Sequence, residues 1–111
     1  MSRLERIQSL IKEAVAEILR RKVQNSKIGF ISITEVQVSK PIDHAWVYFS
    51  QIGNEKEKRE TLKALKTVEK FVSAEVGKVV QTRNSPRIHF VFDESLERGV
   101  DLVNKINALE L

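Results

Sequence analysis

Cysteine is absent from the sequence, which excludes disulfide bonds, thiolate metal ligands and a cysteine nucleophile. Long apolar runs are missing as well: the longest, AWVYF at residues 45–49, has the length of a strand rather than of a membrane span. Histidine is scarce, and His44 and His89 alone do not supply a zinc site or a catalytic triad. The four glycines never cluster, so no phosphate-binding loop is expected. We therefore expect no catalytic activity, no metal or other cofactor, no small-molecule substrate and no membrane partner.

The 111 residues fit one domain, residues 1–111, and 41% apolar residues suffice for one ordinary core. Ser2 and Glu5 have the Ser-x-x-Glu spacing of a capping box just before an apolar stripe. This spacing predicts the start of a helix rather than a signal peptide. A soluble, cytoplasmic protein is the expectation.

The charge is distributed unevenly. Five acidic and two basic residues lie from Asp93 onward and give this part a formal charge of −3. Since the whole chain carries +4, the first 92 residues carry +7. Between Lys63 and His89, six basic residues face only two glutamates, Glu69 and Glu75. Such a region favours a polyanionic partner, with nucleic acid ahead of a membrane surface. The alternative is a well-solvated surface with no partner.

Hydrophobic periodicity predicts an α+β domain in which helices pack on one face of a three-stranded sheet. The expected strands are FISITEVQV (30–38), HAWVYFSQI (44–52) and RIHFVFD (87–93), and the first two form a hairpin around Pro41. The apolar parity of the first strand slips, which predicts a bulge near Thr34 and Glu35. The helices are an opening helix, a long helical region beginning at the N-cap Asn54, and a C-terminal helix capped by Asp93 or Ser95. The sequence leaves open which strand the third one joins.

The long helical region, from about Glu55 to Thr82, would be roughly 40 Å long if it were one helix. A domain of this size has a radius of gyration of only about 13 Å. We therefore expect the helix to break, and Gly77 is the local candidate because glycine weakens a helix interior.

The aromatic residues fall into two groups. Phe49, Phe90 and Phe92 have strand spacing and are expected in the core. Trp46 and Tyr48 lie at the opposite parity, and the sequence leaves open whether they are core or contact residues.

Four segments resemble the bacterial ribosome-binding factor A family, whose fold is a type II KH-like domain. They are RLERI with AEILRRKV, the hairpin IGFISITEVQVSKPIDHAWVYFSQIG, VGKVVQTRNSPRIHFVFD with its Arg-x-x-Pro, and DESLERG. Their order and spacing together are specific, and they cover nearly the whole chain. The resemblance implies the order α-β-β-α-kink-α-β with a C-terminal helix.

The resemblance also implies a function. Members bind the 30S small ribosomal subunit late in assembly, assist processing of 16S rRNA near its 5′ end, matter most in the cold and are not enzymes. The implied partners are the 30S subunit, 16S rRNA and assembly GTPases, and the implied state is a monomer. The alternative is a protein-interaction module that touches ribosomal proteins or a GTPase, rather than RNA, through Trp46 and Tyr48.

The sequence departs from the family and from other KH domains at several positions. The Gly-x-x-Gly loop with which other KH domains grip single strands is absent, and the Ala-x-Gly usual at this family's kink corresponds to Val68, Glu69 and Lys70. Ser73 replaces the usual arginine, and Pro41 replaces an acid in the hairpin turn. The comparison moves the expected kink from Gly77 to Val68–Lys70, and Gly77 then serves close packing inside the second helix.

The candidate RNA-binding residues are basic side chains around the helix pair and third strand, with three outliers. They are Lys63, Lys66, Lys70, Lys78, Arg83 and Arg87, and the outliers Arg3, Arg6 and Lys40.

Overall fold

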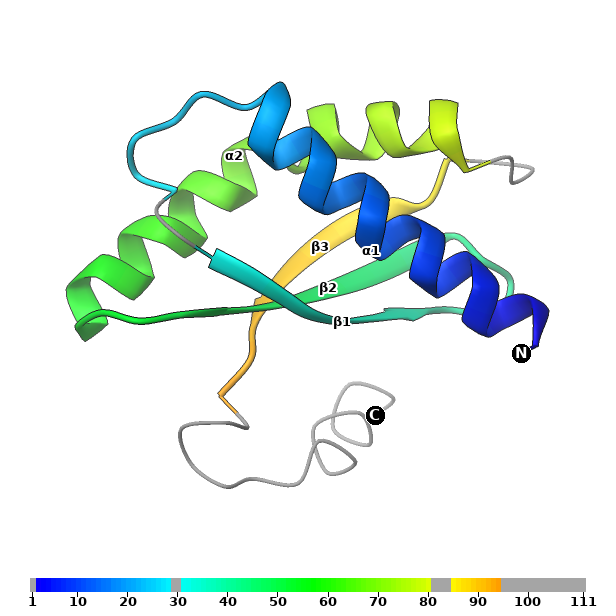
Figure 1. Ribbon diagram of the computed structural model, residues 1–111, viewed down its shortest axis with the longest axis horizontal. Coiled ribbons are helices and arrows are strands. Elements are labelled where there is room, and N and C mark those ends of the chain that lie inside the picture. The colour runs from blue at the N-terminus through cyan, green and yellow to red at the C-terminus, as the bar shows by residue number, and fades with distance from the viewer. Residues whose placement is uncertain (1, 29–30, 81–84, 95–111) are drawn as a thin grey trace.

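The fold is α+β, as predicted, with two helices on one face of a three-stranded sheet (Figure 1). The computed structural model describes residues 2–28, 31–80 and 85–94. The elements are α1 (Arg3–Arg21), β1 (Ile31–Val38), β2 (His44–Gln51), α2 (Glu55–Val79) and β3 (Arg87–Phe92). The sheet order is β1-β2-β3, with β1 and β2 antiparallel and β2 and β3 parallel. The third strand therefore joins the second, which the sequence had left open.

Both helices begin at the predicted caps. The Ser2 hydroxyl accepts the backbone N–H of Glu5 at 3.1 Å and starts α1. Asn54 and Glu57 form a complete capping box, in which each side chain accepts the backbone N–H of the other residue. These contacts satisfy amide groups that have no partner inside the helix, so local sequence is sufficient to fix both starts.

The first strand carries the predicted bulge. The register between β1 and β2 shifts between Ile33 and Glu35, so Thr34 has no single partner on β2. The extra residue changes the parity of β1, and Val36 becomes buried opposite Val47. One apolar face thus results from an irregular apolar pattern.

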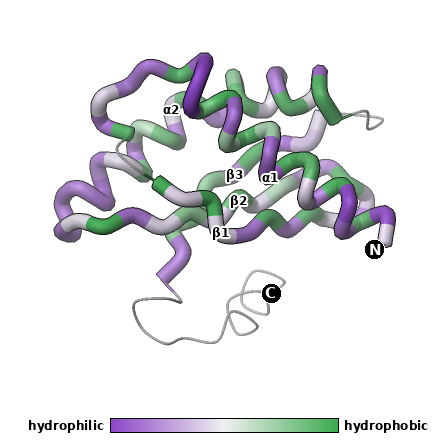
Figure 2. The backbone as a smooth tube through the Cα atoms, in the orientation of Figure 1, coloured by the Kyte–Doolittle hydropathy of each residue, from purple (hydrophilic) through white to green (hydrophobic). Residues whose placement is uncertain are grey.

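The core lies between the sheet and the two helices. Hydrophobic and hydrophilic residues alternate along both helices in Figure 2. Phe49 and Phe90 are in this core, as predicted, and Phe92 packs against it. The buried side chains are Ile7, Ile11, Ala14, Val15 and Ile18 from α1; Leu65, Val72, Val76 and Val80 from α2 and its cap; and Val36, Ala45, Val47, Phe49, Ile88 and Phe90 from the sheet. Burial of this apolar surface is the main term that stabilises the domain.

The prediction that the long helix is interrupted is wrong. α2 is one continuous helix of 25 residues, through both Val68–Lys70 and Gly77. Its length is about 38 Å, and the molecule is flat, with principal extents of 39 × 33 × 23 Å. The radius of gyration, 13.7 Å, is close to the expected value. The helix fits unbroken because the domain is much longer in one direction than its radius of gyration suggests.

α2 nevertheless bends partway along, between its green and yellow-green parts in Figure 1. Two side chains of α2 donate hydrogen bonds to carbonyls of the preceding helical turn. Thr67 Oγ1 donates to Ala64 O at 2.6 Å, and Ser73 Oγ donates to Glu69 O at 2.7 Å. Such back-bonding draws carbonyls out of line and bends helices without ending them.

The predicted C-terminal helix lies outside the described residues. Asp93, one of its two candidate caps, is described: its carboxylate accepts the Thr34 hydroxyl at 2.6 Å, and its backbone N–H donates to Phe49 O. Among the described residues, neither helix is apolar enough over a sufficient length to cross a membrane.

Candidate nucleic-acid interface

One face of α2 carries a row of cations. Its members are exposed and follow one another at intervals of 3, 4, 3 and 4 residues; they are Lys56, Arg59, Lys63, Lys66 and Lys70, here called the basic face. At about 100° per residue these positions share one side of the helix. That side is opposite Leu65, Val72 and Val76, which are fully buried. The core therefore turns the basic face directly to solvent.

Three of the five glutamates of α2, namely Glu60, Glu69 and Glu75, contact other elements of the fold. Glu60 pairs with Lys27 at 3.6 Å, and Glu75 pairs with Lys22 at 3.3 Å. Glu69 accepts the backbone N–H of Phe90 at 2.8 Å and also pairs with Lys66 at 3.1 Å. Glu60 and Glu75 are thus paired with cations outside the basic face, whereas Glu69 partly offsets the charge of Lys66.

The pKa of Glu75 is lowered by its lysine partners. Burial acts to raise the pKa of this carboxyl, but the hydrogen bond and charge of Lys22, together with the charge of Lys78, outweigh burial and lower the pKa. Glu75 therefore stays ionised at neutral pH and pairs with both Lys22 and Lys78.

The structure brings Lys63, Lys66 and Lys70, all predicted from sequence, together on the basic face. Lys78 is exposed further along α2, where it pairs with Glu75 at 3.4 Å. Lys56 and Arg59 extend the row at its N-terminal end, and the sequence analysis missed them. Both could have been predicted, because the spacing of 3 and 4 residues continues back from Lys63. The glutamates between them made this part of the sequence look balanced in charge.

The start of α1, which carries Arg3 and Arg6, and the turn between β1 and β2, which carries Lys40, lie at the end of the molecule marked N in Figure 1, away from the basic face. The hairpin turn and α1 meet there, since Val38 N–H donates to the Gln8 side chain. Arg87 opens β3 at the same end, and its backbone N–H donates to Asp43 O at 2.8 Å. All four cations are exposed. Arg83 lies outside the described residues.

Side chains of α2 seal the outer edge of the sheet. Ser73 Oγ accepts the N–H of Ile88 at 2.9 Å, and Glu69 Oε2 accepts the N–H of Phe90. An edge strand otherwise offers such groups to another chain. Glu69, at the position of the family's kink, and Ser73, at the position of its arginine, thus accept hydrogen bonds from β3 amides. The helical backbone at these positions is not offered to a phosphate in the manner of a Gly-x-x-Gly loop.

The two histidines, which the sequence places on separate strands, meet on the sheet face away from the helices. His44 Nδ1 and His89 Nε2 are 2.9 Å apart, and both rings stack on Trp46 with centroid separations of 5.9 and 5.8 Å. Trp46 is therefore half-buried in a ring cluster, whereas Tyr48 is fully buried. Parallel pairing of β2 and β3, which the sequence did not reveal, creates this contact.

Two histidines without a third ligand do not make a metal centre. No group of three or more histidine, aspartate or glutamate side chains positioned to hold a metal occurs among residues 2–28, 31–80 and 85–94.

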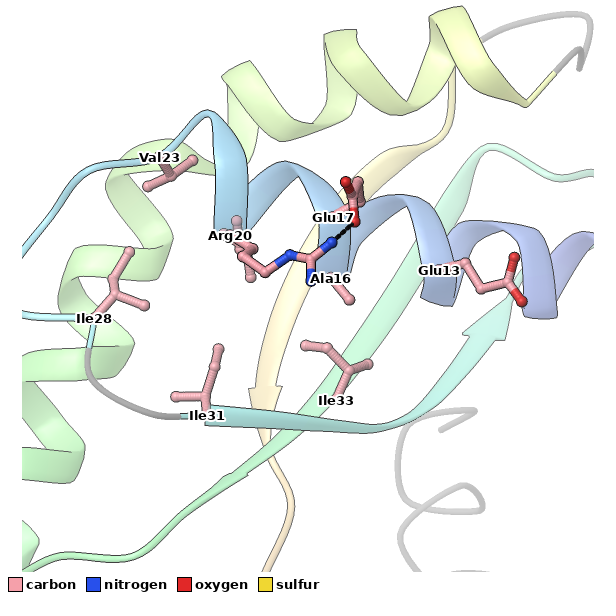
Figure 3. A pocket seen from close by; sticks show the side chains of 9 residues that line it. Glu13, Ala16, Glu17, Arg20, Val23, Ile28, Ile31 and Ile33 are labelled. Atoms are coloured by element: carbon pink, nitrogen blue, oxygen red, sulfur yellow. Dashed lines mark hydrogen bonds and ion pairs between the residues drawn. The ribbon is translucent and has the colours of Figure 1, made fainter.

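A pocket of about 680 Å³ lies between the second half of α1 and the start of β1 (Figure 3). Val23, Ile28, Ile31 and Ile33 give it an apolar lining, and the Glu17–Arg20 ion pair lies at its α1 side. Arg20 is committed to that ion pair, so the pocket is not an extension of the basic face.

The fold and the site define a small KH-like α+β domain with one cationic helix face. The family model for ribosome-binding factor A matches residues 3–106. The ribosome-binding factor A of Dictyoglomus thermophilum is 40% identical over 110 residues, which span 98% of this chain and 92% of that protein. This chain belongs to the ribosome-binding factor A family.

Two solved structures share the fold. The crystal structure of ribosome-binding factor A from Thermus thermophilus has a TM-score of 0.71 at 22% identity, over 81% of this chain and 96% of that one. A homology model of the Thermus thermophilus factor, fitted into a cryo-EM map of its complex with the 30S subunit, has a TM-score of 0.65 at 23% identity, over 86% and 97% of the two chains.

Proposed function

We propose that this protein is a non-catalytic assembly factor that binds the 30S ribosomal subunit, with the basic face of α2 against the phosphates of 16S rRNA. The observation that carries the proposal is the row of five exposed cations opposite the buried side of α2. The Thermus thermophilus relative, whose complex with the 30S subunit has been imaged, supports the choice of partner. Family membership supports a role in late maturation of the subunit.

Phosphate contacts orient a protein on RNA without reading its sequence. The lysines of the basic face are suited to this, since each is a flexible point charge. Docking shape on the subunit then supplies specificity. The proposal includes assistance to 16S rRNA processing near the 5′ end, greatest need in the cold, a cytoplasmic location, a monomeric state and cooperation with assembly GTPases.

A protein-interaction module built on Trp46 and Tyr48 is less well supported. Tyr48 has no exposed surface, and Trp46 packs against both histidine rings. Neither residue offers the open aromatic anchor that such an interface needs.

The first test is sedimentation of the protein with purified 30S subunits, with full ribosomes and with naked rRNA. We expect association with free 30S subunits. Association with full ribosomes but not with free 30S subunits would contradict the proposal.

The second test compares two triple variants with the same change in net charge. One is Lys63→Gln/Lys66→Gln/Lys70→Gln on the basic face, and the control is Lys12→Gln/Arg20→Gln/Arg21→Gln on α1. We expect the first to lose at least ten-fold in affinity for 30S subunits and the control to lose little. Equal losses would mean that overall charge, rather than this face, drives binding.

A further inference from the structure

Phe71 is an exposed aromatic side chain beside the basic face. Phe71 is 43% exposed. The other large hydrophobic residues that are exposed, among those the structure describes, are aliphatic: Leu10, Ile52 and Val79. An isolated exposed apolar residue needs no explanation. An aromatic ring that adjoins a row of cations is a different case, because it offers a π-face next to a phosphate-binding surface.

The surroundings of Phe71 leave room for a flat ligand. Residues three and four positions apart are neighbours on a helix, which makes Thr67 and Ala74 the neighbours of both Phe71 and Lys70. Both neighbours are short and exposed, and the Thr67 hydroxyl is turned back to Ala64 O at 2.6 Å. Between Lys70 and Phe71 the helix surface therefore carries only these two short side chains, and the Thr67 hydroxyl is engaged by a helix carbonyl.

Cations flank this surface on two sides. Lys70 belongs to the basic face, and Lys78 follows Phe71 by two turns, about 10.5 Å along the axis. The Lys78 side chain is 73% exposed, and side chains on a helix lean toward its N-terminus, so Lys78 leans toward Phe71. Glu75 lies near Phe71, but its carboxylate is held by Lys22 and Lys78.

We propose that Phe71 stacks on an unpaired base of the RNA whose phosphates the basic face holds. The inference rests on the proposed function and adds to it the kind of RNA contacted, namely a single-stranded or bulged segment with at least one base free to stack. Aromatic side chains next to cations bind single strands in this way without selecting a sequence, because every base has a π-face. The cations around Phe71 favour RNA over an apolar protein surface, which would leave those charges without partners.

The test measures the affinity for 30S subunits of Phe71→Ala, Phe71→Leu and Phe71→Trp, with Val79→Ala as the matched control. Val79 is an apolar residue of the same helix and is 61% exposed. Stacking predicts losses of about five-fold to a hundred-fold for the alanine and leucine variants. It predicts wild-type affinity for the tryptophan variant and for Val79→Ala. Wild-type affinity of Phe71→Leu would overturn the proposal, since leucine keeps an apolar contact but cannot stack.

Salt dependence separates stacking from phosphate contact. Phe71→Ala should lower affinity at every salt concentration and leave the slope of log K against log [salt] unchanged, because no phosphate contact is lost. Lys70→Gln should reduce that slope by about 0.7 to 0.9. If both lysine and Phe71 variants bind like wild type, the proposed function fails. If only the Phe71 variants do, the stacking inference alone fails.

A fluorescence measurement guards against an indirect effect of misfolding. Trp46 is the single tryptophan of the sequence, so Trp46→Phe/Phe71→Trp carries one reporter at the proposed contact. Its emission should be quenched when 30S subunits are added, while a urea melt reports that the variant is folded. Binding without a change in emission would overturn the proposal.

Discussion

Gly77 of α2 lies against Ser85, in the segment that precedes β3. A methyl group built on its Cα would lie 2.7 Å from Cβ of Ser85, closer than real side chains approach. The predicted role of Gly77 in close packing inside the helix is confirmed. The requirement for glycine here is steric, since residue 77 has ordinary helical backbone within α2.

Gly77→Ala should therefore destabilise the protein, although alanine favours a helix by about 1 kcal/mol. We expect a net loss of about 1–3 kcal/mol in the free energy of unfolding, measured by urea denaturation. The control is Gly53→Ala, whose methyl group would lie 3.5 Å from Glu57 in ordinary contact. Recovery in Gly77→Ala/Ser85→Gly would identify the clash as the cause, and its absence would count against this account.

His89 should make stability depend on pH. Burial and the neighbouring His44 lower the pKa of His89, and the charges of Lys66 and Arg87 act in the same direction against the opposite effect of Glu69. The free energy of unfolding is then highest above the unfolded pKa of about 6.5 and falls as the pH is lowered toward the folded pKa. Urea melts between pH 7.5 and 5 should show this decline.

His89→Gln should flatten that part of the pH profile, because glutamine does not titrate. An unchanged profile in this variant would mean that other groups cause the decline.

At the scale of the element, α2 joins three tasks along one continuous helix. One side supplies the core, the opposite side presents the basic face, and Glu69 and Ser73 bond the edge of β3. A helix that broke at Val68–Lys70 would shift these side chains relative to β3. The bend therefore replaces the break, and the helical backbone is kept through the region where both Glu69 and Ser73 are needed.

Glu69→Ala tests the bond to the sheet edge. Phe90 is 1% exposed, so its N–H would lose its acceptor in a buried position, at a cost of about 1–3 kcal/mol. Glu69→Gln keeps an acceptor oxygen and should lose less. Glu60→Ala is the control, because its pair with Lys27 is half-exposed and worth at most about 1 kcal/mol. Equal losses for Glu69→Ala and Glu60→Ala would contradict the edge-sealing role.

At the scale of the whole molecule, flatness and charge arrangement act together. The domain is 39 Å long but only 23 Å thick, and α2 runs along most of that length (Figure 1). The five positions from Lys56 to Lys70 extend about 21 Å along the helix axis. A phosphate backbone can follow such a row, whereas scattered cations would each contact a separate strand.

Binding to 30S subunits should accordingly weaken with salt. The log–log slope should grow by about 0.7 to 0.9 for each phosphate contacted. The Lys63→Gln/Lys66→Gln/Lys70→Gln variant should have a slope lower by about 2 to 3 than the wild type. Affinity measured from 50 to 300 mM KCl gives both slopes, and salt-insensitive binding would rule out the phosphate clamp.

The sequence by itself determined whatever rests on contacts between near neighbours in the chain. The caps at Ser2 and Asn54, the bulge at Thr34 and the strand faces of Phe49 and Phe90 are of this kind, since each follows from residues within a few positions. Family membership also came from sequence, because the order of four short segments is more specific than any one of them.

Only the tertiary structure decided how distant elements meet. Parallel pairing of β2 with β3 brought His44 to His89, and packing against α1 and β3 engaged Glu75 with Lys22 and Glu69 with the Phe90 N–H. These outcomes depend on the placement of whole elements, which no local spacing encodes. The length of α2 was misjudged for the same reason, since the shape of the domain is a property of the packed layers rather than of the helix.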